Sequence, residues 1–70
     1  MIEMFEERYP NIASWIHEHE GWIEIGRDEY SSSFVRILDL GGMIWEGKER
    51  YRSIDDALAA ADQAVIENKP

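Results

Sequence analysis

The sequence predicts an α+β domain in which a three-stranded antiparallel sheet (a meander) is flanked by an N-terminal and a C-terminal helix, in the order α-β-β-β-α. Apolar residues recur at helical spacing near both ends of the chain. Between them lie three short runs rich in β-branched and aromatic residues, and paired glycines separate the second run from the third. The 70 residues suit one small domain, so we expect residues 1–70 to fold as a single unit.

The N-terminal helix is expected over residues 10–20. Pro10 suits the first position of a helix, where its missing N–H group costs nothing. Four residues at the spacing i, i+3, i+4 and i+7 would form its apolar face: Ile12, Trp15, Ile16 and His19. Gly21 follows, in the right place for a left-handed C-cap. Residues 1–9 would form either a short helical turn or a mobile end.

Three strands are expected over residues 22–25, 34–40 and 43–46, and the polar stretch 27–33 is expected to be a loop. Glycines 41 and 42 can supply the positive φ that a tight hairpin needs. A two-residue turn at 40–41 and one at 41–42 both remain open. For the first two strands, one register pairs apolar with apolar and acid with base: Trp22 with Leu38, Ile23 with Ile37, Glu24 with Arg36, and Ile25 with Val35.

This arrangement predicts a sheet with two apolar faces. Either hairpin turn places even residues of the second strand beside odd residues of the third. An aliphatic face would then carry Ile23, Ile25, Val35, Ile37 and Ile44. Opposite it, an aromatic-rich face with Glu24 would hold the candidate interaction residues Trp22, Phe34, Arg36, Leu38, Met43 and Trp45. Helices on one side of a sheet normally leave the other side polar, so an exposed patch of this kind indicates a binding site or a subunit interface.

Two alternatives stay open for these faces. The aromatic-rich face could form the core, with the aliphatic residues half-exposed or covered by residues 1–9. A β-bulge could also change the register and move side chains from one face to the other.

The C-terminal helix is expected to begin after Ser53, which is placed to act as its N-cap. Asp55 and Asp56 follow in the first turn, where carboxylates favour the positive end of the helix dipole. The apolar stripe of this helix would consist of Ile54, Ala57, Leu58, Ala61, Ala64 and Val65. Residues 68–70 would end it.

Composition excludes several classes of function. The net charge of −8 opposes binding to a phosphate backbone, so nucleic acid is a poor partner and a basic protein surface a better one. The chain has no cysteine, and hence no disulfide or thiolate. Its acidic N-terminus lacks the features of a signal peptide, and no stretch approaches the ~20 apolar residues of a membrane span. We expect a cytoplasmic protein with no membrane partner.

The residues that could carry chemistry do not form a catalytic pattern. His17 and His19 lie two apart on the expected helix and would point to different faces, so no metal site is expected. The serines at 31–33 have no base nearby in sequence, and the glycine spacing does not match a phosphate-binding loop. We therefore expect no catalytic residue, no metal, no cofactor and no small-molecule ligand.

Two families resemble parts of this pattern. The helix–three strands–helix order resembles the double-stranded-RNA-binding fold, whose RNA contact implies a basic start of the last helix; here residues 53–56 are acidic, so the fold is implied without RNA affinity. Residues 34–42 and 53–58 resemble the HicB-type antitoxin domain, which implies a protein that blocks a small basic ribonuclease. The whole chain is more similar to small acidic bacterial domains of this topology, a resemblance that implies no activity.

The sequence alone does not establish a function. Our first hypothesis is a non-catalytic protein–protein interaction module, homodimeric or binding another protein through the apolar sheet face. The alternative is an antitoxin-like inhibitor that binds a small basic enzyme. A double-stranded-RNA-binding-like fold without RNA affinity is the third hypothesis.

Overall fold

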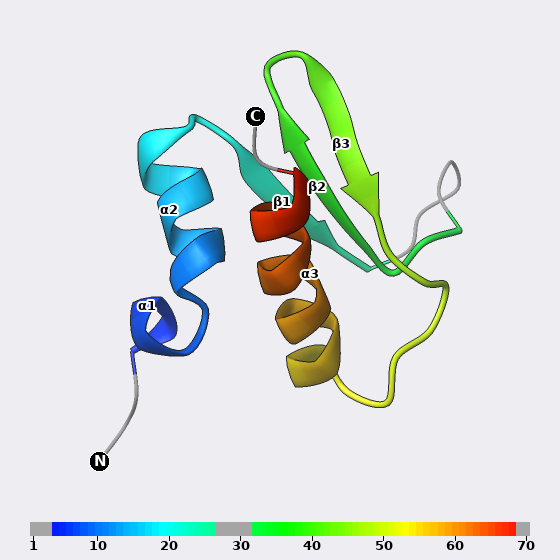
Figure 1. Cartoon of the computed structure of the whole chain (residues 1–70). Helices are drawn as coiled ribbons and strands as arrows, with labels where there is room; N and C mark the ends of the chain where they lie inside the picture. The colour runs from blue at the N-terminus through cyan, green and yellow to red at the C-terminus, as the bar shows by residue number, and fades with distance from the viewer. Residues whose placement is uncertain (1–3, 27–31, 69–70) are drawn as a thin grey trace.

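The computed structural model describes residues 4–26 and 32–68 (Figure 1). Its elements, in chain order, are α1 (Phe5–Arg8), α2 (Pro10–Glu18), β1 (Trp22–Ile25), β2 (Val35–Asp39), β3 (Gly42–Glu46) and α3 (Ile54–Asn68). The α+β class and the α-β-β-β-α order are confirmed, and α1 is the short helical turn that was one of the two alternatives for residues 1–9. Residues 1–3, most of the expected loop (27–31) and residues 69–70 lie outside the described residues.

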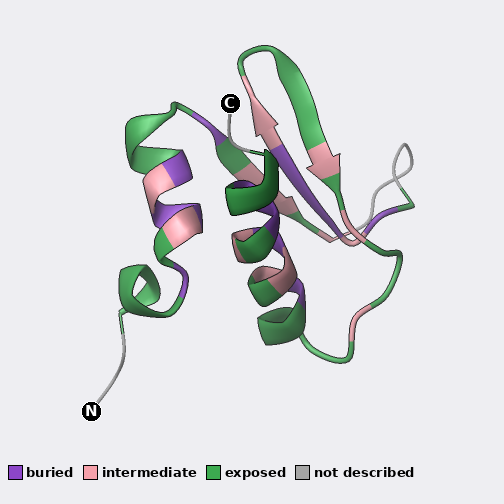
Figure 2. Ribbon diagram, viewed as in Figure 1, coloured by how far each residue is buried: buried purple, intermediate pink, exposed green. Residues whose placement is uncertain are grey.

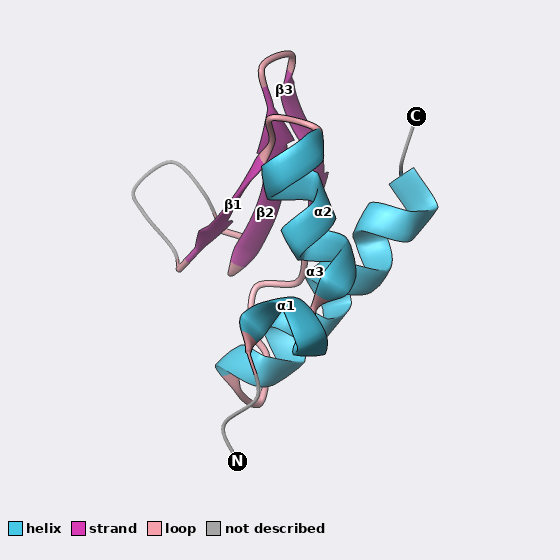
Figure 3. Cartoon of the chain, turned by 90° about the vertical axis from the view of Figure 1, so that its left-hand side faces the viewer, coloured by secondary structure: helices cyan, strands magenta, loops and turns pink. Residues whose placement is uncertain are grey.

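The described elements form two layers. The strands make one antiparallel sheet in the order β1-β2-β3, and the helices lie together on one side of it (Figure 3). The core lies between these layers and appears as the buried stripe on α2, α3 and β2 in Figure 2. It consists of Tyr9, Ile12, Trp15, Val35, Ile37, Ala57, Ala61, Ala64 and Val65. Because three of the four core residues of α3 are alanines, this helix can pack closely on the sheet and on α2.

Asp62 of α3 caps the first turn of α2 from across the helix interface. Its Oδ1 atom accepts the backbone N–H groups of Asn11 and Ile12 at 2.9 and 3.0 Å, and its Oδ2 atom accepts the side-chain amide of Asn11 at 2.9 Å. The first N–H groups of a helix have no partner within that helix. The side chain of Tyr9, the N-cap residue, makes no capping bond. One carboxylate therefore joins the two helices and completes the start of α2.

We expect Asp62→Ala to lower the free energy of unfolding by about 2 kcal/mol, because it removes three hydrogen bonds and leaves two backbone donors without their acceptor. Urea denaturation followed by far-UV circular dichroism measures the change. Glu67→Ala is the matched control, since it removes an exposed carboxylate from the same helix. Equal stability of the two variants would show that the inter-helix cap contributes nothing.

A second junction joins the α1–α2 boundary to the start of α3. The buried Tyr9 donates its hydroxyl hydrogen to Oδ1 of Asp55, and Arg8 Nη2 lies 2.8 Å from Asp55 Oδ2. The hydrogen bond to Asp55, helped by burial, raises the pKa of Tyr9 above its usual value. The hydrogen bonds from Tyr9 and Arg8 lower the pKa of Asp55. At neutral pH a neutral phenol thus donates to an ionised carboxylate.

The end of α2 differs from the sequence prediction. The helix ends at Glu18, and the left-handed residue that follows is Glu20, with φ 57°, rather than Gly21. Gly21 is required for a different reason: a Cβ atom there would lie 2.0 Å from Trp15 Nε1. The absent side chain lets the backbone run against the indole. Ile16, expected on the buried face, is exposed because the face of α2 in the core is formed by Ile12 and Trp15.

The predicted register of the first two strands is confirmed, with Trp22 opposite Leu38 and Glu24 opposite Arg36. Of the two possible hairpin turns, the structure adopts the one at 40–41, because Asp39 pairs with Gly42. The pairing of β2 with β3 then shifts by one residue at a β-bulge: Leu38 lies opposite Met43, but Ile37 lies opposite Trp45. The extra residue is on β3, an edge strand of the sheet.

The start of α3 is as predicted. The hydroxyl of Ser53 accepts the backbone N–H of Asp56 at 3.1 Å, which is the expected N-cap bond. Ile54 is the exception in the expected apolar stripe: it is exposed, because it precedes the first turn that reaches the core at Ala57.

Candidate functional site

The β-bulge divides the six residues predicted to form one interaction face. Directly opposed residues of an antiparallel pair share a face, so Trp45 shares the face of Ile37, which the helices cover. Its ring packs against the core, where a Cβ atom on Gly47 would be 2.9 Å from Trp45 Cη2 and 2.8 Å from Val35 Cγ1. The prediction that Trp45 shares a face with Leu38 is therefore wrong, and so is the prediction that Ile44 shares the aliphatic face, because Ile44 is the bulged residue and is exposed. The bulge is the alternative that the sequence left open.

Phe34 also leaves the predicted face. It lies just before β2, where the chain bends, and its half-buried ring packs against the core. The ring centroid is 6.2 Å from that of Tyr51, in a tilted arrangement. Phe34 thus supports the loop that follows β3.

Arg36 lies on the predicted face but is buried, with 5% of its surface exposed. Its Nε atom donates to Glu24 at 3.1 Å, one terminal nitrogen donates to the carbonyl and hydroxyl oxygens of Ser33, and the other donates to the carbonyl oxygen of Gly26 at 2.7 Å. These partners lie on β1 or near the two ends of the segment between β1 and β2. Arg36 is thus a clamp within the sheet, and it offers little to a partner molecule.

Three of the predicted residues do form a surface. Trp22 lies opposite Leu38, and Leu38 lies opposite Met43, so their side chains make a row across β1, β2 and β3. Successive residues of a strand point to opposite faces, so this row lies on the side away from the buried Ile37 and the helices. Trp22 is 40% exposed, Met43 is 51% exposed and Leu38 is half-buried. No helix of the described ranges 4–26 and 32–68 covers this apolar row (Figure 3).

A charged row runs beside the apolar row. Glu24 lies opposite Arg36, and Arg36 lies opposite Glu46, so two carboxylates stand on either side of the buried guanidinium. That guanidinium donates four hydrogen bonds within the chain, whereas Glu46 is exposed and the side chain of Glu24 is 44% exposed. We call the two rows together the open sheet face. It combines an apolar strip with a net negative border.

Comparison with known proteins adds no assignment. No family model, curated protein or solved structure matches this chain. The chemistry of its surfaces is therefore the basis for a functional proposal.

The two histidines of α2 have separate surroundings. His17 Nε2 lies 3.7 Å from Glu6 Oε2, and the ring of His19 stacks on that of Trp15 with centroids 5.5 Å apart. Within the part of the chain that the structure describes, no group of three carboxylate, imidazole or thiol side chains is placed to hold a metal ion. No helix in this part is long and apolar enough to cross a membrane.

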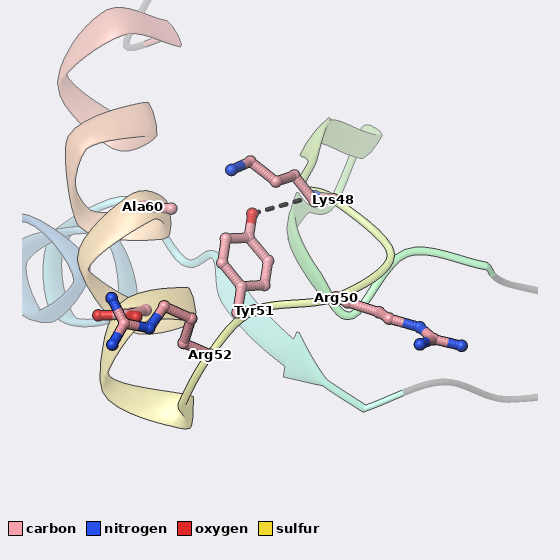
Figure 4. A pocket seen from close by; sticks show the side chains of 6 residues that line it. Lys48, Arg50, Tyr51, Arg52 and Ala60 are labelled. Atoms are coloured by element: carbon pink, nitrogen blue, oxygen red, sulfur yellow. Dashed lines mark hydrogen bonds between the residues drawn. The ribbon is translucent and has the colours of Figure 1, made fainter.

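A second surface, which the sequence prediction missed, lies between α3 and the loop that follows β3. A shallow concavity of about 620 Å³ is lined by Lys48, Arg50, Tyr51, Arg52, Asp56 and Ala60, and we call it the basic concavity (Figure 4). The available signal was the clustering of three cations within five positions of an acidic chain.

Proposed function

We propose that this chain is a non-catalytic protein–protein interaction module of the cytoplasm, and that its open sheet face binds a partner protein presenting an apolar patch bordered by basic side chains. The observation that carries the proposal is the row of Trp22, Leu38 and Met43, which remains accessible on the side of the sheet opposite the helices. Exposed apolar strips of this kind, bordered by polar groups, are typical of interaction sites.

The charge of the open sheet face favours a basic partner over a second copy of the chain. In a symmetric dimer through this face, Glu24 and Glu46 would approach the same acidic surface on the other copy. Among the described residues of the face, Arg36 is the single cation, and it is buried and donates four hydrogen bonds to Glu24, Gly26 and Ser33. A partner with Lys or Arg around an apolar patch avoids this repulsion, and the net charge of −8 would accelerate its approach.

A small basic enzyme would be one such partner. If the acidic open sheet face covered its active site, the chain would act as an inhibitor, which is the narrower function that the antitoxin resemblance implies. Co-expression with a candidate enzyme tests this version: rescue of growth, lost in a variant of the open sheet face, supports inhibition.

The general proposal is tested with a synthetic amphipathic helix of leucine and lysine, titrated while tryptophan fluorescence is recorded. We expect binding to shift the emission of Trp22 to shorter wavelength as the indole leaves water. Met43→Glu should weaken binding about tenfold by placing a carboxylate in the apolar row. Leu40→Glu is the control, because it adds the same charge at the hairpin tip, where Leu40 is 81% exposed.

Non-specific attraction predicts the opposite result. Each substitution adds one negative charge, so a purely electrostatic complex with the cationic helix would become tighter in both variants. A loss restricted to Met43→Glu supports the open sheet face, and equal behaviour of the two variants rejects it. Light scattering adds a further check on the partner. If the wild-type chain were a dimer and Met43→Glu were a monomer, the partner of the open sheet face would be a second copy of the chain and not a basic protein.

A further inference from the structure

The cations of the loop between β3 and α3 differ from the other described Lys and Arg residues in that they form no ion pair within the described residues. Arg8 pairs with Asp55, and Arg36 pairs with Glu24. By contrast, no ion pair within residues 4–26 and 32–68 engages Lys48, Arg50 or Arg52. The chain has 15 acidic and 7 basic residues, so carboxylates are abundant. A cluster of cations without a carboxylate partner in such a chain is available to an external anion.

The loop that carries these cations is anchored at its start. The backbone N–H of Gly47 donates to Val35 and the carbonyl of Lys48 accepts from Phe34, both at 2.8 Å. The hydroxyl of Tyr51 accepts the backbone N–H of Lys48 at 3.0 Å. Gly47 permits this close approach, because a Cβ atom there would lie 2.3 Å from the Tyr51 hydroxyl oxygen. The concavity is thus held open by the fold, which reduces the ordering cost of binding.

The side chains in the basic concavity have distinct directions. The ammonium of Lys48 lies 5.6 Å from the centroid of the Tyr51 ring. Figure 4 shows the Lys48 side chain reaching past the Tyr51 hydroxyl toward α3, and that of Arg52 extending toward the first turns of α3. The side chain of Arg50 points away from both Tyr51 and α3. Lys48 and Arg52 therefore face the hollow, with the Tyr51 ring and Ala60 as apolar walls between them.

The start of α3 does not supply the attraction. Ser53 already caps it, and Asp55 and Asp56 occupy its first turn. Asp56 is the carboxylate among the residues that line the concavity, against the three cations Lys48, Arg50 and Arg52. The excess of positive charge comes from side chains of the loop.

We propose that the basic concavity is a second binding surface, and that it takes a short acidic peptide segment of a partner protein, with an apolar residue on the Tyr51 ring and carboxylates at Lys48 and Arg52. Arginine and lysine bind carboxylates by charge-assisted hydrogen bonds. The concavity is open to solvent, which suits a peptide better than a metabolite that needs enclosure. A nucleic acid would extend beyond three cations onto a surface of net charge −8. With the open sheet face, the chain would offer two surfaces of opposite charge.

The test uses the fluorescein-labelled peptide Glu-Glu-Leu-Glu-Glu and fluorescence anisotropy. We expect the double variant Lys48→Gln/Arg52→Gln to bind about tenfold more weakly than the wild type. Arg50→Gln is the comparison variant: Arg50 also lines the concavity, but its side chain points away from Tyr51 and α3, so this substitution should weaken binding less than Lys48→Gln or Arg52→Gln alone. Replacing leucine by serine in the peptide should weaken binding, because the contact with Tyr51 is lost. Circular dichroism verifies that each variant is folded.

Two further measurements separate this proposal from its competitors. Met43→Glu should leave peptide binding unchanged, so that failure of the open sheet face and failure of the basic concavity are distinguishable. A short oligothymidine should not compete with the peptide. The proposal is overturned if wild-type protein does not bind the peptide, if Arg50→Gln weakens binding as much as the double variant, or if oligothymidine displaces the peptide.

Discussion

Gly21→Ala is expected to lower the free energy of unfolding by about 3 kcal/mol and the melting temperature by about 15 °C. The added Cβ atom would lie 2.0 Å from Nε1 of Trp15 and 2.4 Å from its Cε2. The indole cannot move aside without cost, because it is 2% exposed and its Nε1–H donates to the carbonyl of Leu38 at 3.0 Å. Either the backbone after α2 shifts, or Trp15 loses its hydrogen bond and its place in the core.

Thermal and urea denaturation measure this loss, and Gly41→Ala is the control. Gly41 lies in the exposed hairpin turn, where a Cβ atom would meet only the flexible carboxylate of Asp39 at 3.3 Å. We expect this control to change the stability by less than about 0.5 kcal/mol. If the two alanine variants were equally stable, close packing of the backbone on Trp15 would not be a determinant of the fold.

The role of Gly21 shows one limit of reasoning from sequence. A glycine after a helical pattern predicts a left-handed cap, because caps are the commonest use of glycine in that position. Here the positive φ is at Glu20, and Gly21 is needed because the side chain of Trp15, from the preceding helix, packs against the backbone at this position. The local pattern contains the glycine and the tryptophan but does not indicate that they touch.

The register of β1 and β2 could be predicted because two independent signals agree. The alternation of apolar residues and the pairing of Glu24 with Arg36 select the same alignment, and the structure has it. For β3, the assignment of side chains to a face depends only on whether a residue number is even or odd. One extra residue in the strand is enough to reverse that assignment. The bulge takes Trp45 to the covered face and leaves the smaller Ile44 partly in solvent, which buries the larger apolar surface.

The same bulge decides how much of the candidate site was predictable. Trp22, Leu38 and Met43 are paired at positions that the bulge does not shift, so the sequence correctly predicts that they share one side of the sheet. The basic concavity was not found, because its character depends on which cations lack an intrachain partner. That is a property of the folded chain: Arg8 and Arg36 are paired, although neither has more carboxylates within five positions in the sequence than Arg52 has.

Arg36→Ala should also lower the free energy of unfolding by about 3 kcal/mol. The guanidinium bonds Glu24, the carbonyl of Gly26 and both oxygens of Ser33. Removing it leaves these acceptors, some of them buried, without a donor. Such a loss would show that Arg36, on the open sheet face, stabilises the sheet through these bonds.

Arg36→Lys separates charge from geometry at this position. Lysine keeps the positive charge, but its single ammonium cannot reach the acceptor on β1 and those at both ends of the segment between β1 and β2, so about 2 kcal/mol should still be lost. Arg50→Ala is the control for removing a guanidinium from the surface and should be nearly neutral. Urea denaturation of the three variants decides the matter. If Arg36→Lys matched the wild type, the charge opposite Glu24 would be sufficient and the forked donor geometry would not matter; if Arg36→Ala matched Arg50→Ala, the hydrogen bonds of Arg36 would contribute nothing to the stability of the sheet.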